Sequence, residues 1–265
     1  MRIVLTGSSS GIGQLIAERI LREGNHVWGI ARSDQKNQFT DFGDLFESSI
    51  CDVGNWEELE KISHTVETKW KSINAIIACA GIQGAIGKTL SLDPILWKNT
   101  VNSNLIGTFN TIRAFNFLFK DQDKRSKVIC FSGGGGTQAR PHFSAYGTAK
   151  TGIIRLVETI ASEEVSRAMD INCIAPGSIN TRLTDEVIAQ GATQAGEREY
   201  ATALEQKKNG GQSIDKAIDL ILWLLSSKSD GVSGKILSAQ WDNWGTENID
   251  NLKKPELYKL RRTTP

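Results

Sequence analysis

The stretch TGSSSGIG, residues 6–13, decides the fold. It follows the apolar run of residues 2–6 and precedes an amphipathic stretch, so it joins a first strand to a first helix. Gly7 permits a sharp turn, Gly11 lets a phosphate group approach the backbone, and Gly13 allows the helix to pack closely. The start of such a helix offers free N–H groups and a partial positive charge to an anion. The loop therefore predicts a dinucleotide-binding site.

Short apolar runs alternate with longer amphipathic stretches along most of the chain. Residues 56–70 (WEELEKISHTVETKW) carry apolar residues at helical spacing, which gives one buried stripe. Several short runs are apolar on both faces, as parallel strands covered on both sides must be. The runs that we expect to form strands are RIVLT, HVWGIA, SSIC, NAIIACA, KVICFS, INCIA and GKILSA. The alternation predicts an α/β fold, a Rossmann-like doubly wound parallel sheet with helices on both faces.

We expect a single domain over residues 1–245, because no internal repeat or linker-like segment interrupts the chain. Residues 183–212 break the regular alternation with a polar and charged stretch before the next helix. A connection of that length is functional or disordered as a rule, and we expect a lid over the substrate. Residues 246–265 form a locally basic tail, which we expect to be solvated or packed against another subunit.

The composition excludes several classes of function. The chain has 265 residues, a net charge of +1 and 39% hydrophobic residues, which gives no case for binding nucleic acid or an anionic membrane. No apolar run approaches the ~18 residues of a membrane span. The four cysteines lie far apart without a CxxC pair, so we expect no metal site. The first strand begins at residue 1, which leaves no room for a signal peptide, and we expect a cytoplasmic protein.

Five further motifs follow the glycine loop in a fixed order. They are CDV (51–53), ACAG (78–81), NLIG (104–107), YGTAK (146–150) and APGSINT (175–181). Together with the GxxxGxG spacing of the loop, they resemble the short-chain dehydrogenase/reductase family in its compact single-domain branch. The resemblance covers most of the chain, residues 2–238. It implies an NAD(P)-dependent oxidoreductase that interconverts a carbonyl and a secondary alcohol.

The loop and the resemblance together imply which residues bind the cofactor. These residues are Gly7, Ser9, Ser10, Gly11, Ile12, Gly13, Arg32, Ser33, Asp52, Val53, Ala80, Gly81, Tyr146, Lys150, Pro176, Gly177, Ile179 and Thr181. The end of the second strand favours one of the two nicotinamide dinucleotides. An acidic residue there would bind the ribose 2′-hydroxyl, but this chain has Ala31, followed by Arg32 and Ser33, which suit a 2′-phosphate. We therefore expect NADP(H), with NAD(H) the less favoured cofactor.

The resemblance also implies three catalytic residues. Tyr146 and Lys150, at positions i and i+4, share one face of a helix. A nearby ammonium group favours the ionised form of a phenol, which can then take or give the proton of an alcohol. In the family the lysine also holds the nicotinamide ribose. Asn104 stands where the family's asparagine fixes a water that links the lysine to solvent.

The serine that binds the substrate oxygen in this family is missing. Its expected position, thirteen residues before the tyrosine, is Gly133, the first of four consecutive glycines. Ser132 stands one residue earlier, and a shift of one residue along a strand points a side chain to the opposite face. Three explanations stay open. In the first, another hydroxyl replaces the serine, because Ser132 swings inward or Thr137 reaches back. In the second, backbone N–H groups of the glycines polarise the substrate; in the third, the site is catalytically weak.

Two rival functions follow from the sequence. A non-catalytic nucleotide-binding or sensing protein would explain Gly133, although the intact Tyr146, Lys150 and Asn104 argue against it. A sugar-nucleotide-modifying enzyme would belong to the family's longer branch, which the chain length and the loop spacing disfavour.

The substrate end of the site is predicted only in outline. Residues 183–212 contain many charged side chains, and Arg182 directly precedes them. This composition favours a small polar substrate. Arg140 and His142, between the glycines and the tyrosine, are expected to edge the pocket.

Family members pair through two long helices, so we expect a homodimer or homotetramer formed through residues 99–119 and 144–166. Trp241 and Trp244 follow the last strand, where a diglycine is common in the family. We expect these tryptophans at a subunit interface or in the core rather than at a ligand.

Overall fold

The computed structural model describes residues 1–120 and 124–262. Within these residues, seven strands form one parallel sheet in the order β3-β2-β1-β4-β5-β6-β7. The strands are β1 (Arg2–Thr6), β2 (His26–Ala31), β3 (Phe46–Ile50), β4 (Ala75–Ala78), β5 (Ser126–Phe131), β6 (Met169–Ala175) and β7 (Lys235–Ser238). The strand order reverses between β1 and β4, and their carboxyl ends leave a crevice at that point. The predicted doubly wound sheet is confirmed.

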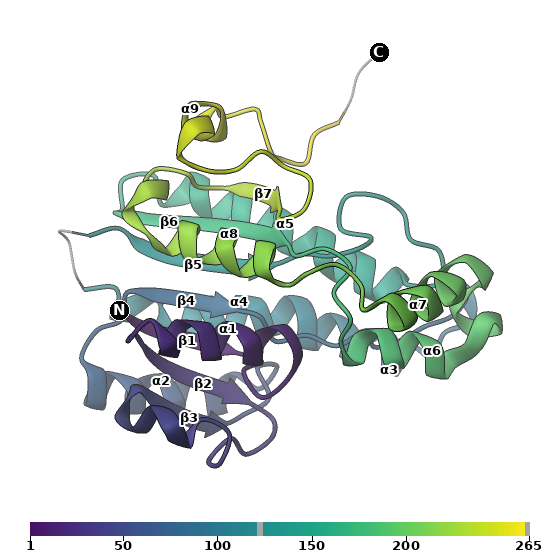
Figure 1. Ribbon diagram of the computed structural model, residues 1–265, viewed down its shortest axis with the longest axis horizontal. Coiled ribbons are helices and arrows are strands. Elements are labelled where there is room, and N and C mark those ends of the chain that lie inside the picture. Colours follow the sequence, from purple (N-terminus) through teal and green to yellow (C-terminus); the bar gives the residue numbers. More distant parts are fainter. Residues whose placement is uncertain (121–123, 263–265) are drawn as a thin grey trace.

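Helices cover both faces of this sheet (Figure 1). They are α1 (Gly11–Arg22), α2 (Trp56–Trp70), α3 (Pro94–Val101), α4 (Gly107–Phe115), α5 (Ser144–Glu163), α6 (Arg182–Ala195), α7 (Glu197–Asn209), α8 (Asp215–Leu225) and α9 (Ile249–Lys253). Along β1, Ile3 and Leu5 face a core shared with α1 and α8. Val4 faces a second core, shared with α2, α4 and α5. Because both faces are buried, the strands are apolar on both sides.

The helix predicted over residues 56–70 is α2, with the same bounds. Asn55 caps its start by accepting a hydrogen bond from the backbone N–H of Glu58, at 3.2 Å. Of the predicted apolar stripe, Leu59, Val66 and Trp70 are fully buried in the second core. The helical period of the sequence thus fixed which face of α2 meets the sheet.

Residues 183–212, expected to be a lid, lie in a helical hairpin of α6 and α7 beyond the carboxyl ends of the strands (Figure 1). The two helices pack against each other along their length. Val187 of α6 and Ala203 of α7 share a small apolar cluster with Phe143 and Tyr146. The polar stretch is therefore folded, and it packs directly on the start of α5.

The C-terminal segment packs back onto its own chain as far as Arg261. Leu252 of α9 is buried in the core that also holds α1 and α8. The backbone N–H of Ile236 in the edge strand β7 donates to the carbonyl of Tyr258, at 2.8 Å. The carboxylate of Glu158 on α5 accepts from the backbone N–H of Leu260, at 2.7 Å. This segment therefore covers the edge of the sheet at β7, while most of its side chains, including Lys253, Lys254 and Arg261, remain exposed.

The two tryptophans after β7 have different surroundings. Trp244 packs against the core beside Trp223, with ring centroids 6.3 Å apart. Trp241 is 79% exposed. The core position expected for this pair is thus confirmed for Trp244 alone.

The four cysteines are free thiols, and burial raises the pKa of Cys173 to about 12. In residues 1–120 and 124–262, no three histidine, cysteine, aspartate or glutamate side chains gather in a way that could hold a metal ion. Among the helices of the same residues, none is both long enough and apolar enough to span a membrane.

We predict that Glu158→Ala releases the C-terminal segment. The variant loses a buried carboxylate that accepts hydrogen bonds from Arg155 and Leu260. Hydrogen bonds to a charged group contribute up to about 3 kcal/mol, so the free energy of unfolding is expected to fall by about 2 kcal/mol. Urea denaturation and the rate of tryptic cleavage after Arg261 measure both effects.

Glu163→Ala is the control, because this glutamate is on the same helix but exposed. It is expected to change stability by less than about 0.5 kcal/mol. Equal stability and equal cleavage of the two variants would contradict the proposed anchoring by Glu158.

Candidate active site

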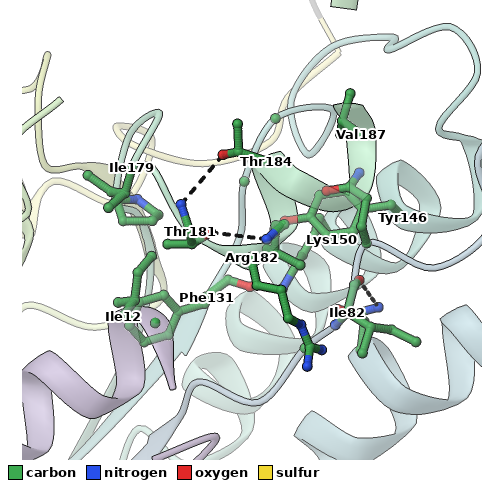
Figure 2. A pocket seen from close by; sticks show the side chains of 18 of the residues that line it. Ile12, Ile82, Phe131, Tyr146, Lys150, Ile179, Thr181, Arg182, Thr184 and Val187 are labelled. Carbon is green, nitrogen blue, oxygen red and sulfur yellow. Dashed lines mark hydrogen bonds between the residues drawn. The ribbon is translucent and has the colours of Figure 1, made fainter. Parts of the chain in front are cut away.

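A cavity of about 880 Å³ lies at the carboxyl ends of the strands, between the sheet and the lid hairpin. Figure 2 shows side chains from the glycine loop, from α5 and from the start of α6 that line this pocket. All the residues predicted to bind the cofactor or to act in catalysis line it. Sequence positions more than 170 residues apart, from Gly7 to Thr181, are thus brought to one cavity. This is the edge at which doubly wound sheets bind ligands.

The glycine loop forms a close-fitting cradle. Gly7 has φ +77°, and its N–H donates to the carbonyl of Ile30 at 2.7 Å. A Cβ on Gly7 would lie 2.8 Å from the Cα of Ala80, and one on Gly13 would lie 2.2 Å from the Gly7 oxygen. Ser10, the N-cap of α1, makes no side-chain capping bond, which leaves the first turn of the helix open to a ligand. These features fit the pyrophosphate of a dinucleotide.

The adenosine end of the cavity is formed by β2 and by the turn after β3. Ala31 is buried, whereas Arg32 and Ser33 are exposed and line the cavity. Arg32 forms no ion pair within residues 1–120 and 124–262. Asp52 accepts from the backbone N–H of Gly54 at 2.8 Å, which holds the turn of the CDV motif. A guanidinium group is therefore available at the point where an acidic residue would select NAD(H).

Tyr146, Lys150 and Asn104 converge below this cradle. The Lys150 ammonium lies 5.4 Å from the centroid of the Tyr146 ring and donates to the carbonyl of Phe131 at 3.0 Å. Both side chains are buried, at 7% and 5% exposure. A Cβ on Gly81 would lie 2.7 Å from Asn104 Oδ1 and 3.6 Å from Lys150 Nζ, so the ACAG motif separates these two side chains.

Asn104 lies in a π-helical turn, Asn102–Ile106, between α3 and α4. Its side-chain amide donates to the carbonyls of Thr100 (2.8 Å) and Ile82 (3.0 Å). Its Oδ1 accepts from the Ile82 N–H at 3.3 Å. Single π turns inside helices are frequent at functional sites. Here the turn fixes Asn104 against the end of β4.

The four glycines form a tight turn on the side of Tyr146. The Gly136 N–H donates to the Gly133 carbonyl at 2.9 Å, and Gly135 has φ +93°. A Cβ on Gly133 would lie 2.8 Å from Tyr146 Oη. The first glycine therefore occupies the place from which a serine would face the tyrosine. Within the described part of the chain, the N–H groups of Gly133, Gly134 and Gly135 have no hydrogen-bond acceptor.

The two neighbouring hydroxyls, of Ser132 and Thr137, differ in their position relative to the cavity. Ser132 is buried but lines the cavity, and a Cβ on Gly136 would collide with its Oγ. Thr137 is exposed and does not line the cavity. Of the two candidate hydroxyls, Ser132 therefore borders the cavity and Thr137 does not.

The loop between the glycines and Tyr146 is bonded to the lid. Arg140 pairs with Glu199 of α7 at 2.7 Å, and its guanidinium lies 3.8 Å from the centroid of the Phe143 ring. His142, with φ +70°, lies 2.8 Å through Nδ1 from the carbonyl of Gln194 in α6. Arg140 and His142 were predicted to edge the pocket, and both line it. Their lid partners were not predictable, because no local pattern pairs positions more than 50 residues apart.

The fold and the cavity define a class of protein. A dinucleotide cradle and a buried tyrosine–lysine pair in one cavity belong to an NAD(P)-dependent oxidoreductase that acts on CH–OH groups. The family model described as short chain dehydrogenase matches residues 1–192. The chain belongs to the short-chain dehydrogenase/reductase family, as its motifs predicted.

Two relatives and one solved structure show the extent of the similarity. Mouse dehydrogenase/reductase SDR family member 4 is 28% identical over 243 residues, 88% of this chain and 83% of the mouse protein. The 3beta-hydroxysteroid dehydrogenase 1 of Eggerthella lenta is 28% identical over 200 residues, 73% of this chain and 76% of that protein. The structure of a variant of actinorhodin polyketide ketoreductase with NADPH superposes with a TM-score of 0.77 at 21% identity. The superposition covers 89% of this chain and 94% of the ketoreductase chain. The last comparison shows the shared fold.

We predict that Gly133→Ala lowers kcat/KM for carbonyl reduction by about tenfold or more. The added methyl group would lie 2.8 Å from Tyr146 Oη, and small displacements of a reacting group are costly to catalysis. Gly134→Ala is the matched control, since the nearest atom to its added Cβ is Arg140 Cδ, 3.8 Å away. Steady-state rates of both variants, with Tm as a check of folding, measure the difference. Equal rates in the two variants would contradict this placement of Gly133.

Proposed function

We propose that this enzyme transfers a hydride between NADP(H) and the carbonyl or secondary alcohol of a small polar substrate. The observation that carries the proposal is the convergence of Tyr146, Lys150 and the glycine turn on one cavity with the glycine loop. NADP(H), when bound, supplies or accepts the hydride. The protein residues hold the two reactants together and move the proton.

Tyr146 is the proposed acid and base. Its hydroxyl faces the glycine turn, and its ring packs in the apolar cluster beneath the lid, which limits access of water. In the reducing direction Tyr146 gives its proton to the carbonyl oxygen; in the oxidising direction it takes the proton of the alcohol. Lys150, whose ammonium lies beside the Tyr146 ring, binds the ribose in this proposal. Asn104, fixed in its π turn, serves the path by which Lys150 exchanges protons with solvent.

The N–H groups of Gly133, Gly134 and Gly135 are proposed to do the work of the family's serine. These three residues line the cavity, and their N–H groups have no acceptor within the described residues. Fixed N–H donors aimed at an oxygen that gains negative charge stabilise the transition state, as in an oxyanion hole. A turn of glycines also leaves room for a substrate close to the backbone.

Arg32 and Ser33 are proposed to bind the 2′-phosphate of NADP(H). Arg32 has no carboxylate partner in the described chain, and it lines the cavity at the end of β2. The remaining predicted cofactor residues are proposed to hold the rest of the dinucleotide, within a domain of residues 1–245. A polar substrate is favoured by the charged and amide side chains that line the lid end of the cavity, namely Gln138, Arg140, Glu197, Arg198, Glu199 and Gln206.

We also propose a homodimer or homotetramer in the cytoplasm. Ile106 and Phe109 of the α4 region are 42% and 44% exposed, as apolar side chains at an interface between two copies would be. Four free thiols, three of them buried, are compatible with a reducing compartment.

We predict that the enzyme reduces small polar ketones with NADPH at least about tenfold more efficiently than with NADH, because Arg32 offers the 2′-phosphate a charged donor. Tyr146→Phe is expected to lower kcat by about 100-fold or more, since the proton donor is removed while the ring remains. The affinity for NADPH, measured by nicotinamide fluorescence, should stay near the wild-type value. Tyr200→Phe is the control, because this lid phenol does not line the cavity.

Turnover that survives in Tyr146→Phe would overturn the mechanism, and equal use of NADH would overturn the role of Arg32. Tight NADPH binding without turnover, on a panel widened to nucleotide sugars, would favour the rival of a sensing protein. Turnover of the nucleotide sugars alone would favour the other rival.

A further inference from the structure

Arg182, the first residue of α6, borders two cavities. It lines the main cavity and a second one of about 370 Å³ beneath the lid. Arg32 and Ile82 line both cavities as well. Figure 2 shows the Arg182 side chain extending from the start of α6 into the pocket. Two guanidinium groups, one just after β2 and one at the start of α6, therefore border both cavities.

The charges that line the second cavity are not balanced. Among the residues that line the second cavity, the two arginines face a single carboxylate, that of Glu186. Arg182 donates to it through Nε at 3.1 Å, and the other Glu186 oxygen accepts from the Gln83 N–H at 3.3 Å. The Arg182 side chain is still 61% exposed, so most of its five N–H donors remain available. An anionic ligand would neutralise the excess positive charge of the two arginines.

The neighbourhood of Gln83 provides a second and independent indication of a polar ligand. Gln83 is 3% exposed and lines the main cavity. Its Nε2 is buried and has no hydrogen-bond partner among the described residues. Buried amide groups without partners are rare in folded proteins, and a missing ligand is one explanation for them.

The start of α6 faces the glycine loop. A Cβ on Gly11 would lie 3.8 Å from the side chain of Thr181, which caps α6 and precedes Arg182. Gly11 is the loop residue at which the pyrophosphate of a dinucleotide approaches the backbone. Arg32, by contrast, follows β2, where the ribose 2′-position lies. Arg182 is therefore on the pyrophosphate side of the cavity and Arg32 on the 2′ side.

We propose that Arg182 binds the pyrophosphate of the nicotinamide dinucleotide from the lid, opposite the glycine loop. This inference rests on the proposed use of such a cofactor. The guanidinium adds charge-assisted hydrogen bonds to those of the loop N–H groups. Since Arg182 belongs to α6, the cofactor then holds the lid hairpin over the cavity. Arg32 discriminates NADP(H) from NAD(H), whereas Arg182 acts on both.

The test is the affinity of Arg182→Gln for NADPH and for NADH, measured by nicotinamide fluorescence without substrate. Loss of a hydrogen-bonded charge is expected to raise both dissociation constants by the same factor, about tenfold. Arg19→Gln is the matched control, because Arg19 pairs with Glu23 at the same i,i+4 spacing and the same 3.1 Å, on α1. It should leave both constants unchanged, and Tm reports on the folding of both variants.

The outcomes separate the two proposals. Unchanged affinities in Arg182→Gln would overturn the inference and leave the proposed function intact. A loss confined to NADPH would overturn the assignment to the pyrophosphate, since only the 2′-phosphate differs between the two cofactors. Failure of the wild-type chain to bind either dinucleotide would overturn the proposed function itself.

Discussion

The arrangement of the active site depends on one backbone contact, between the glycine turn and α5. A Cβ on Gly135 would lie 3.3 Å from the Cα of Gly147, and one on Gly147 would lie 3.3 Å from the Gly135 oxygen. The Thr151 hydroxyl lies 2.9 Å from the carbonyl oxygens of Gly136 and Gly147, and so holds the two segments together. Close approach of this kind requires residues without a side chain at both positions.

This contact relates the missing serine to the position of Tyr146. The turn lies directly on the first turns of α5, and Gly133, Gly134 and Gly135 line the same cavity as Tyr146. The same turn brings Gly136 close to the Ser132 hydroxyl. In our account the glycines are a specific replacement for a side-chain donor, and the tyrosine, lysine and asparagine keep their usual places around them.

Features of the sequence that depend on local geometry predicted the structure well. The helical period of residues 56–70 defined α2, and the apolar runs defined the strands, because burial on both faces leaves a direct mark on composition. The loop glycines were assignable for a similar reason, since Gly7 and Gly13 contact backbone that no side chain could approach. The position of Gly133 opposite Tyr146 followed from the spacing that the family resemblance implies, thirteen residues before the tyrosine.

Features that depend on long-range pairs were not predictable. The Arg140–Glu199 ion pair and the bond from His142 to the lid join residues whose types alone suggest solvated loops. The packing of the C-terminal segment rests on Glu158 and on the edge of β7, and a basic composition gives no sign of either. The two helices within residues 183–212 were not predicted from this polar stretch. The reason is that α7 buries little apolar surface, so its apolar residues show only a weak helical period.

The central claim is that backbone N–H groups of the glycine turn bind the substrate oxygen. Its most direct test is ¹⁵N–¹H correlation spectroscopy of glycine-labelled protein with NADP⁺, titrated with a secondary alcohol that the enzyme oxidises. The account predicts that the amide resonances of Gly133 to Gly135 move to lower field as hydrogen bonds form, while those of the remote Gly24 and Gly43 stay in place. Saturation by the alcohol without movement of the Gly133 to Gly135 resonances would contradict it.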